Sequence, residues 1–332
     1  MRKSQTVGAL LGALLALTVV PAIPAAEHPA ALDVQGHRGA RGLAPENTLA
    51  GFRRALAVGV TTLELDVGMT RDGVLVVSHD SRLNPDLTRD AAGAWIEDPG
   101  PALRELSFDE LRRYDVGRAR PGSMTAELFA DQHAADGERI PALAEVLALA
   151  PAPVRFNIET KLDPRKPELA PPPEAFAEAL VRELRRAGVA ERASIQSFDW
   201  RTLKHAARLA PEIERVCLTT LAPRGGNLQP NRPGVPPTLA GLDLDDFAGS
   251  VPKLVRAAKC AVWSPQHAEI EGDALAEAQA LGLRVVPWTV NAPTRMEELL
   301  AMGVDGIITD YPDRLRQVMR ARGLPLPEPR AR

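Results

Sequence analysis

Short apolar runs alternate with longer amphipathic stretches along most of this 332-residue chain. The short runs are four to seven residues long and rich in Val, Ile and Leu, which is typical of buried strands. They predict strands at 32–35, 63–67, 74–77, 154–160, 193–198, 215–220, 261–264, 284–290 and 306–309. The longer stretches carry apolar residues three or four positions apart. They predict helices at 49–58, 140–149, 174–187, 200–209, 246–259 (with a break at Pro252), 272–281, 294–302 and 313–322.

The repeated order of strand and helix predicts an α/β fold with a parallel sheet covered by helices. About eight such units, in a chain of this length, fit a closed (β/α)8 barrel of the TIM type. An open, doubly wound sheet is the alternative. The first expected strand is not followed by the glycine pattern of a dinucleotide-binding turn, so the barrel is favoured.

The strand expected at 63–67 carries acids at every second position. Leu63, Leu65 and Val67 face one side of it, and Glu64 and Asp66 face the other, because side chains alternate along a strand. A solvent-facing edge strand is the simpler interpretation. A turn at 71–73 and an apolar strand at 74–77 predict a paired hairpin, however, which favours a buried position for the two acids.

Three segments interrupt the alternation. Residues 81–139 are rich in Pro, Gly, Asp and Ala and hold one clear helix signal, a capping box that begins at Ser107. We expect an insertion here, after the hairpin of the second strand, lying over the barrel mouth. Residues 222–241 hold five prolines and four glycines and predict a loop, and residues 323–332 predict a flexible tail.

The first 26 residues have the pattern of a secretory signal peptide. Two basic residues precede an apolar run at 7–20, and small residues follow up to Ala26. The run is shorter than the ~20 residues that a membrane span needs. We expect cleavage after Ala26, with Ala25 as the alternative, rather than an uncleaved anchor. The mature protein then consists of the barrel domain, residues 27–322, and the tail that follows it. We expect it to be periplasmic or secreted, with no stable membrane insertion after cleavage.

Charge and cysteine content bear on the expected partners of the protein and on the state of its two thiols. The formal net charge is −3, and no basic stripe appears, so a nucleic acid partner is not expected. Cys217 and Cys260 could pair in an oxidising compartment. Both lie in apolar, strand-like runs, and free cysteine is among the most buried residue types, so we predict two buried free thiols.

Candidate metal ligands lie on two expected strands. In a barrel the catalytic groups come from the carboxyl ends of the strands. Glu64, Asp66 and Glu159 are placed to meet there. An oxygen-only set favours one hard divalent cation, Ca²⁺ or Mg²⁺, whereas zinc more often recruits histidine. Salt bridges from these acids to Arg38 and Lys161, without a metal, are the alternative.

His37 and His79 are the candidate acid–base pair, since histidine titrates near neutral pH and each follows a strand. The sequence does not say which is the acid. A structural role is the alternative for a lone histidine, and we apply it to His205 within the helix 200–209. Arg38 and Lys161 are the cations suited to binding phosphate. The alternative role for Lys161 is an exposed ion pair with Asp163.

The motifs around these residues follow one another in a fixed order. They are HRG at 37–39, PENT at 45–48, ELD at 64–66, HD at 79–80, NIETK at 157–161, QSF at 196–198, WTVN at 288–291 and GVDGIITDYP at 303–312. From about His37 to about Arg320 this series resembles the glycerophosphodiester phosphodiesterase family. The resemblance favours the metal over simple salt bridges. It implies hydrolysis to sn-glycerol 3-phosphate and an alcohol, the glycerol 2-hydroxyl attacking first and water opening the cyclic phosphate.

Four further residues are expected to support the site. Glu46 is placed to orient Arg38 or a histidine, and Asn291 to hold the loop after the seventh strand. Phe198 and Trp288, at strand ends, are expected to line a pocket for the small-molecule glycerophosphodiester, with Trp263 as a further candidate.

Two other functions remain open from the sequence. A phospholipase D-like or phosphoinositide-cleaving barrel would act on intact lipid and need an apolar rim or a basic patch, but residues 222–241 have few large apolar side chains. A non-catalytic barrel that only binds glycerophosphodiesters would lack a histidine or a metal-binding acid, and none is missing.

Overall fold

The computed structural model describes residues 31–222, 226–228 and 238–330. Within them, eight parallel strands form a nearly closed barrel in the order β8-β7-β6-β5-β4-β2-β1-β9, with β3 paired antiparallel to β2. The strands are β1 (Asp33–Gly36), β2 (Thr62–Met69), β3 (Leu75–Val77), β4 (Arg155–Thr160), β5 (Ala193–Ser197), β6 (Glu214–Thr219), β7 (Val262–Pro265), β8 (Arg284–Val285) and β9 (Gly306–Thr309). The predicted TIM-type barrel is confirmed.

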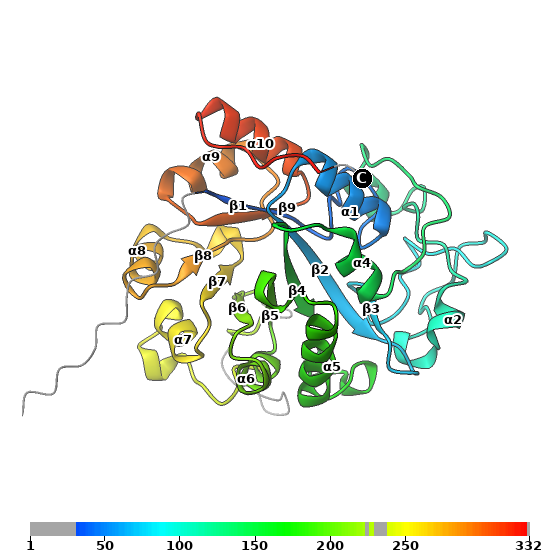
Figure 1. The fold of residues 1–332 in the computed structure, drawn as a ribbon, viewed down its shortest axis with the longest axis horizontal. Coiled ribbons are helices and arrows are strands. Elements are labelled where there is room, and N and C mark those ends of the chain that lie inside the picture. The colour runs from blue at the N-terminus through cyan, green and yellow to red at the C-terminus, as the bar shows by residue number, and fades with distance from the viewer. Residues whose placement is uncertain (1–30, 223–225, 229–237, 331–332) are drawn as a thin grey trace, which may run out of the picture.

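Helices surround the strands, as Figure 1 shows. The outer helices are α1 (Leu49–Val58), α4 (Leu143–Leu149), α5 (Pro173–Arg186), α6 (Trp200–Leu209), α7 (Val251–Ala257), α8 (Gly272–Ala280), α9 (Pro293–Met302) and α10 (Pro312–Ala321). Thr48 caps α1 by accepting a hydrogen bond from the Gly51 amide, and Gly59 ends the helix with a φ of 96°. Pro252 lies in the first turn of α7 and does not break a longer helix.

The barrel closes between its first and last strands. β1 pairs with β9 along its whole length. On the other side of β9, the Val290 amide donates to Ile308 and the Ile308 amide donates to Pro287, both at 3.0 Å. The strand predicted at 284–290 is shortened to Arg284–Val285 because Pro287 has no amide hydrogen to continue the ladder.

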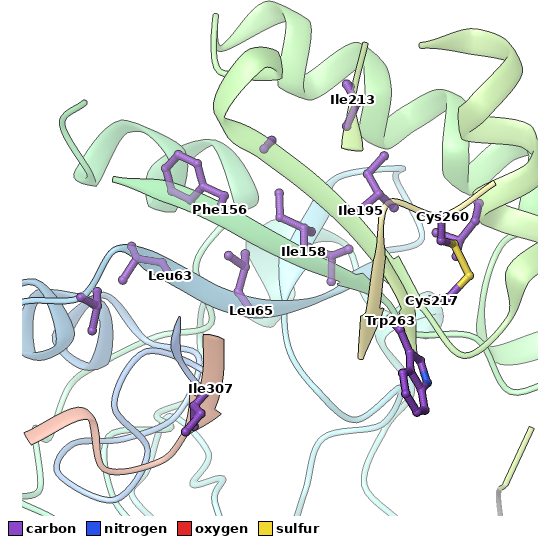
Figure 2. Packing of buried hydrophobic residues seen from close by; sticks show 14 of the residues in the cluster. Leu63, Leu65, Phe156, Ile158, Ile195, Ile213, Cys217, Cys260, Trp263 and Ile307 are labelled. Atoms are coloured by element: carbon purple, nitrogen blue, oxygen red, sulfur yellow. A yellow bond between two sulfur atoms is a disulfide. The ribbon is translucent and has the colours of Figure 1, made fainter. Parts of the chain in front are cut away.

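The main core lies between the strands and the helices. Leu63 and Leu65 of β2 and Ile158 of β4 are fully buried in it, as Figure 2 shows. The predicted alternation on β2 is confirmed, since Glu64 and Asp66 occupy the opposite face of the strand, inside the barrel. The barrel interior therefore presents acids where an ordinary core would present aliphatic side chains.

The segment 81–139 forms a lobe beside the barrel, drawn in cyan to green in Figure 1. It holds the short helices α2 (Phe108–Leu111) and α3 (Met124–Leu128), where one helix was predicted, and the capping box at Ser107 is present. Leu83, Leu103 and Leu111 of this segment form a second apolar cluster with Val76 of β3 and with Ile140. The Gln132 side-chain amide donates to the Arg41 carbonyl at 2.7 Å, so the segment contacts the loop that follows β1.

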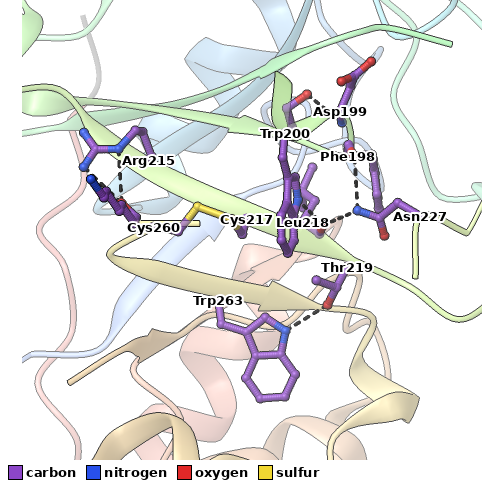
Figure 3. Close-up of a disulfide and its surroundings, with 12 residues drawn as sticks. Phe198, Asp199, Trp200, Arg215, Cys217, Leu218, Thr219, Asn227, Cys260 and Trp263 are labelled. Atoms are coloured by element: carbon purple, nitrogen blue, oxygen red, sulfur yellow. Dashed lines mark hydrogen bonds between the residues drawn. A yellow bond between two sulfur atoms is a disulfide. The ribbon is translucent and has the colours of Figure 1, made fainter. Parts of the chain in front are cut away.

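Cys217 and Cys260 form a disulfide, so the prediction of two free thiols is wrong. β6 and β7 are neighbours in the barrel, which places the two Cα atoms 5.9 Å apart although 43 residues separate them. Figure 3 shows the bond between β6 and the chain that leads into β7. The pairing depends on strand order, which neither apolar run reveals by itself.

Several expectations concern the ends and loops of the chain. The predicted signal peptide and most of the loop 222–241 lie outside the described residues. The tail was predicted to be flexible, yet Leu324 and Leu326 pack against the core and the Arg330 amide donates to Leu56 at 2.7 Å. In the described part of the chain, no helix has the length and apolar character needed to cross a membrane.

Candidate active site

The loop after β1 places His37 and Arg38 at the carboxyl end of the barrel. Arg38 has a φ of 50°, in the left-handed region that non-glycine residues rarely adopt. This turn directs its amide to Glu64 Oε2 at 2.8 Å. Gly36 must be a glycine, because a Cβ there would lie 2.1 Å from the Gly39 carbonyl oxygen.

Both predicted catalytic histidines are held by an aspartate at Nδ1. The distance is 2.6 Å from His37 to Asp310 and 2.8 Å from His79 to Asp80. A carboxylate only accepts, so each neutral imidazole carries its proton on Nδ1 and leaves the Nε2 lone pair for reaction. Asn291, predicted to support the site, donates to the second oxygen of Asp310 at 2.6 Å.

Burial governs the titration of both imidazoles. It lowers the pKa of His37 below the ordinary value, while the Asp310 carboxylate acts in the opposite direction. Burial likewise lowers the pKa of His79, and the Lys161 ammonium adds to the effect. Both rings are therefore largely neutral near pH 7, where a neutral imidazole can accept a proton.

The three predicted metal ligands come together inside the barrel. Asp66 and Glu159 are direct partners across β2 and β4, and Glu64 lies two residues before Asp66 on the same face. One carboxylate oxygen from each lies within 4.8 Å of the others, and all three side chains are buried. This oxygen-only set fits a hard divalent cation such as Ca²⁺ or Mg²⁺.

Lys161 and Arg38 lie beside these acids. Lys161 Nζ lies 2.7 Å from Glu159 and 3.6 Å from Asp66, while Arg38 Nε lies 3.3 Å from Asp66. The alternative partner proposed for Lys161 is wrong, because Asp163 pairs with Arg165. Three carboxylates against two cations leave one negative charge in excess, which a divalent ion would offset.

The pKa values of the acids follow from this arrangement. Burial raises the pKa of Glu64 well above its ordinary value, and the Asp66 carboxylate adds to the rise. Burial also raises the pKa of Glu159, against the effect of Lys161. Burial opposes ionisation of Asp66, but Lys161 and Arg38 together hold its pKa far below the ordinary range. Without a metal, the two glutamates are therefore the acids that most readily hold a proton, whereas Asp66 stays ionised.

Glu46 occupies the supporting place predicted for it. Its carboxylate accepts from Arg38 Nη1 at 2.7 Å and lies 2.9 Å from Arg41 Nε. The Arg41 guanidinium in turn stacks on the Phe129 ring of the lobe, 4.3 Å from its centre. The lobe therefore helps to fix the loop that carries Arg38.

Phe198 and Trp288 lie together, whereas Trp263 does not join them. The first two rings meet edge to face with their centres 5.3 Å apart. Trp263 is buried in the main core and donates to the Thr219 hydroxyl at 2.8 Å, as Figure 3 shows. His205 lies outside the site on α6, 3.2 Å from Glu174, in agreement with its structural interpretation.

A family model described as the glycerophosphoryl diester phosphodiesterase family matches residues 37–314. The chain belongs to this family. It is an enzyme, a phosphoric diester hydrolase, and the matched residues run from His37, directly after β1, to the beginning of α10.

Individual relatives agree with this membership. A glycerophosphodiester phosphodiesterase of Caldanaerobacter subterraneus subsp. tengcongensis is 30% identical over 292 residues, covering 87% of this chain and 98% of the relative. A crystal structure from Silicibacter pomeroyi, of a chain named for the same family, is 36% identical with a TM-score of 0.77 and covers 90% of this chain and 96% of that one. An Oleispira antarctica phosphodiesterase in complex with its product sn-glycerol-3-phosphate is 22% identical with a TM-score of 0.64, covers 87% of this chain and 96% of that one, and shares the fold.

Sequence reasoning missed three residues of this phosphodiesterase site. Asp80 and Asp310 hold the histidines, and Asn47 donates to Asp66 at 2.9 Å. Asp310 directly follows β9, as His37 follows β1, and Asp80 lies three residues after the end of β3, so position near a strand end could have singled them out. Asn47 has a φ of 54°, which asparagine tolerates better than most residues, but its partner depends on how the loop folds.

Proposed function

We propose that this enzyme hydrolyses glycerophosphodiesters to sn-glycerol 3-phosphate and an alcohol, with one divalent cation, Ca²⁺ or Mg²⁺. The observation that carries the proposal is the convergence of two aspartate-held imidazoles, three acids and two cations at one end of the barrel. His37 and His79 both lower the pKa of Asp66, which supports their acting in one site with the acids.

His37 and His79 act as the acid–base pair. One neutral imidazole takes a proton at Nε2 from the attacking hydroxyl. The other must be in its imidazolium form, protonated on Nε2 as well as on Nδ1, and it delivers the Nε2 proton to the departing alcohol oxygen. Asp310 and Asp80 hold the rings in the required tautomer and stabilise the imidazolium when it forms, because the pKa of each carboxyl is about 2 and both stay ionised.

Arg38 and Lys161 bind the phosphate. Arg38 Nε is buried and pairs with Asp66 at 3.3 Å, but it makes no hydrogen bond among the described residues, which supports its donating to a phosphate oxygen. Bound to Glu64, Asp66 and Glu159, the cation would supply Lewis-acid stabilisation of the phosphate charge. The two side-chain cations add to the same effect in a site from which water is largely excluded.

The two ends of the substrate face different parts of the molecule. Phe198 and Trp288 offer an apolar wall for the glycerol portion. A cavity of about 40 Å³ lies beside His79 between residues 45–47 and the lobe, and the leaving alcohol lies on that side. Barrel enzymes commonly vary their specificity through such loops.

We also propose that the enzyme is exported to the periplasm or secreted. The signal-like pattern of residues 1–26 motivates this proposal. The Cys217–Cys260 disulfide supports it, since structural disulfides persist in oxidising compartments.

The test is product formation from glycerophosphocholine with and without a chelator. Free sn-glycerol 3-phosphate is measured by a coupled dehydrogenase assay, alongside metal content by elemental analysis. We expect turnover to stop in chelator and to return with Ca²⁺ or Mg²⁺. Full turnover by metal-free protein would refute the requirement for a divalent cation. Product released from intact phospholipid, and not from glycerophosphocholine, would favour a lipid-cleaving enzyme.

A further inference from the structure

A series of hydrogen-bonded, buried side-chain amides links β1, β4, β5 and β2 at the level of the acids. It begins at Asp33 in β1, passes through Gln35, Asn157 and Gln196, and ends at Glu64. The four successive donor–acceptor distances are 2.8, 2.9, 2.9 and 2.6 Å. All three amide side chains are almost fully buried, so water does not substitute for these bonds.

The hydrogen bonds of this amide series run in fixed donor-to-acceptor directions. Asn157 Nδ2 donates in both directions, to Gln35 and to Gln196. Each glutamine accepts on its oxygen and therefore turns its own NH₂ group outward, Gln35 to Asp33 and Gln196 to Glu64. Carboxylates end the chain on both sides and can only accept when ionised, so every bond in the series is satisfied in this one arrangement.

Glu64 differs from the other two acids in how it is held. Asp66 and Glu159 lie against Lys161. In the part of the chain that the structure describes, Glu64 has no ion pair, and its two oxygens accept only from neutral groups, Gln196 Nε2 and the Arg38 amide. Neutral donors orient a carboxylate without cancelling its charge, which leaves that charge available to a cation.

We propose that Asn157 and Gln196 are positioning residues that orient Glu64 as a metal ligand and thereby set the affinity of the site for its cation. This inference rests on the proposed function, because it takes the three acids to be the cation site. Gln196 acts on Glu64 directly, and Asn157 acts through Gln196 by fixing which end of that amide faces the acid.

The experiment measures the dissociation constant for Ca²⁺ and Mg²⁺ by calorimetry on the metal-stripped full protein, with thermal unfolding recorded on each sample. Gln196→Met keeps the side-chain length but removes the donor to Glu64, and we expect affinity to fall about 10- to 100-fold. Asn157→Asp should flip the Gln196 amide, because an ionised carboxylate at position 157 can only accept a hydrogen bond. The Gln196 NH₂ group would then face residue 157, and its oxygen would face Glu64. We expect this substitution to weaken binding at least as much.

Two controls separate positioning from structural support. Gln35→Met removes the far arm of the chain and should change affinity by less than about threefold, because Asn157 still donates to Gln196. Ser264→Ala removes a buried hydrogen bond to the Val286 carbonyl elsewhere in the barrel and should leave affinity unchanged. Both controls report how far a loss of stability alone affects the measurement.

The outcomes are distinct. Tight binding by wild type with affinity unchanged in Gln196→Met would overturn the positioning role while leaving the proposed function intact. Absence of binding by wild type would overturn both. If Asn157→Asp does not fold, Gln196→Met decides the question, since it introduces no buried charge.

Discussion

The disulfide between Cys217 and Cys260 closes a loop of 43 residues that includes the segment 222–241. A cross-link stabilises a protein largely by restricting its unfolded chain. That treatment gives ~3 kcal/mol for a 15-residue loop and ~4.7 kcal/mol for a 100-residue loop, so this bond should contribute about 4 kcal/mol to the free energy of unfolding.

The assay is equilibrium unfolding in guanidinium chloride, followed by tryptophan fluorescence, with and without a thiol reductant. Both cysteines are almost fully buried, so the reductant must be present throughout unfolding and refolding. With a denaturant slope of ~4 kcal/mol per molar, the loss of about 4 kcal/mol lowers the midpoint by about 1 M. The Cys217→Ser/Cys260→Ser variant should match the reduced protein.

Catalysis should be unaffected below the unfolding transition, because Cys217 and Cys260 belong to the core between strands and helices and not to the barrel interior. Equal midpoints for the oxidised and reduced protein would refute the loop-closure reasoning. Two reactive thiols in unreduced, denatured protein would show that the bond does not form at all.

Three further predictions concern the chemistry. His37→Ala and His79→Ala should each lower kcat at least ~10²-fold, whereas the matched control His205→Ala should leave it unchanged; a near-wild-type rate removes that residue from the mechanism. Asp310→Asn removes the charge that raises the pKa of His37, so the limb of the pH–rate profile that reports His37 should move to lower pH, and a move to higher pH contradicts the assignment. Values of kcat/KM for glycerophosphocholine, -ethanolamine and -glycerol should be similar and collapse on bis(p-nitrophenyl) phosphate, which lacks the glycerol hydroxyl; a strong preference for one headgroup would show a selective alcohol pocket.

Local patterns predicted much of the fold. The bounds expected for α6 and β9 are those observed, since each is a clean periodic run between turn residues. The two faces of β2 could be read from alternation, and the hairpin expected with residues 74–77 favoured a buried position for Glu64 and Asp66.

Long-range partners could not be predicted in the same way. The disulfide, the Asp310 contact to His37 and the amide series through Asn157 each join residues that lie on, or directly beside, different strands. Their meeting depends on strand order and register, and a single sequence gives no direct measure of either. Trp263 illustrates the same limit, because its position near a strand end did not reveal that it faces the helices.

The bond from His37 to Asp310 spans 273 residues of sequence. It joins the loop after β1 to the residue that follows β9, so it forms only when the first and last strands of the barrel pair. A growing or truncated polypeptide that lacks β9 therefore holds its metal-binding acids and both imidazoles but leaves one imidazole unsupported. Activity of this enzyme should report completed synthesis and barrel closure together, which makes turnover a sensitive probe for intermediates that are compact but still open.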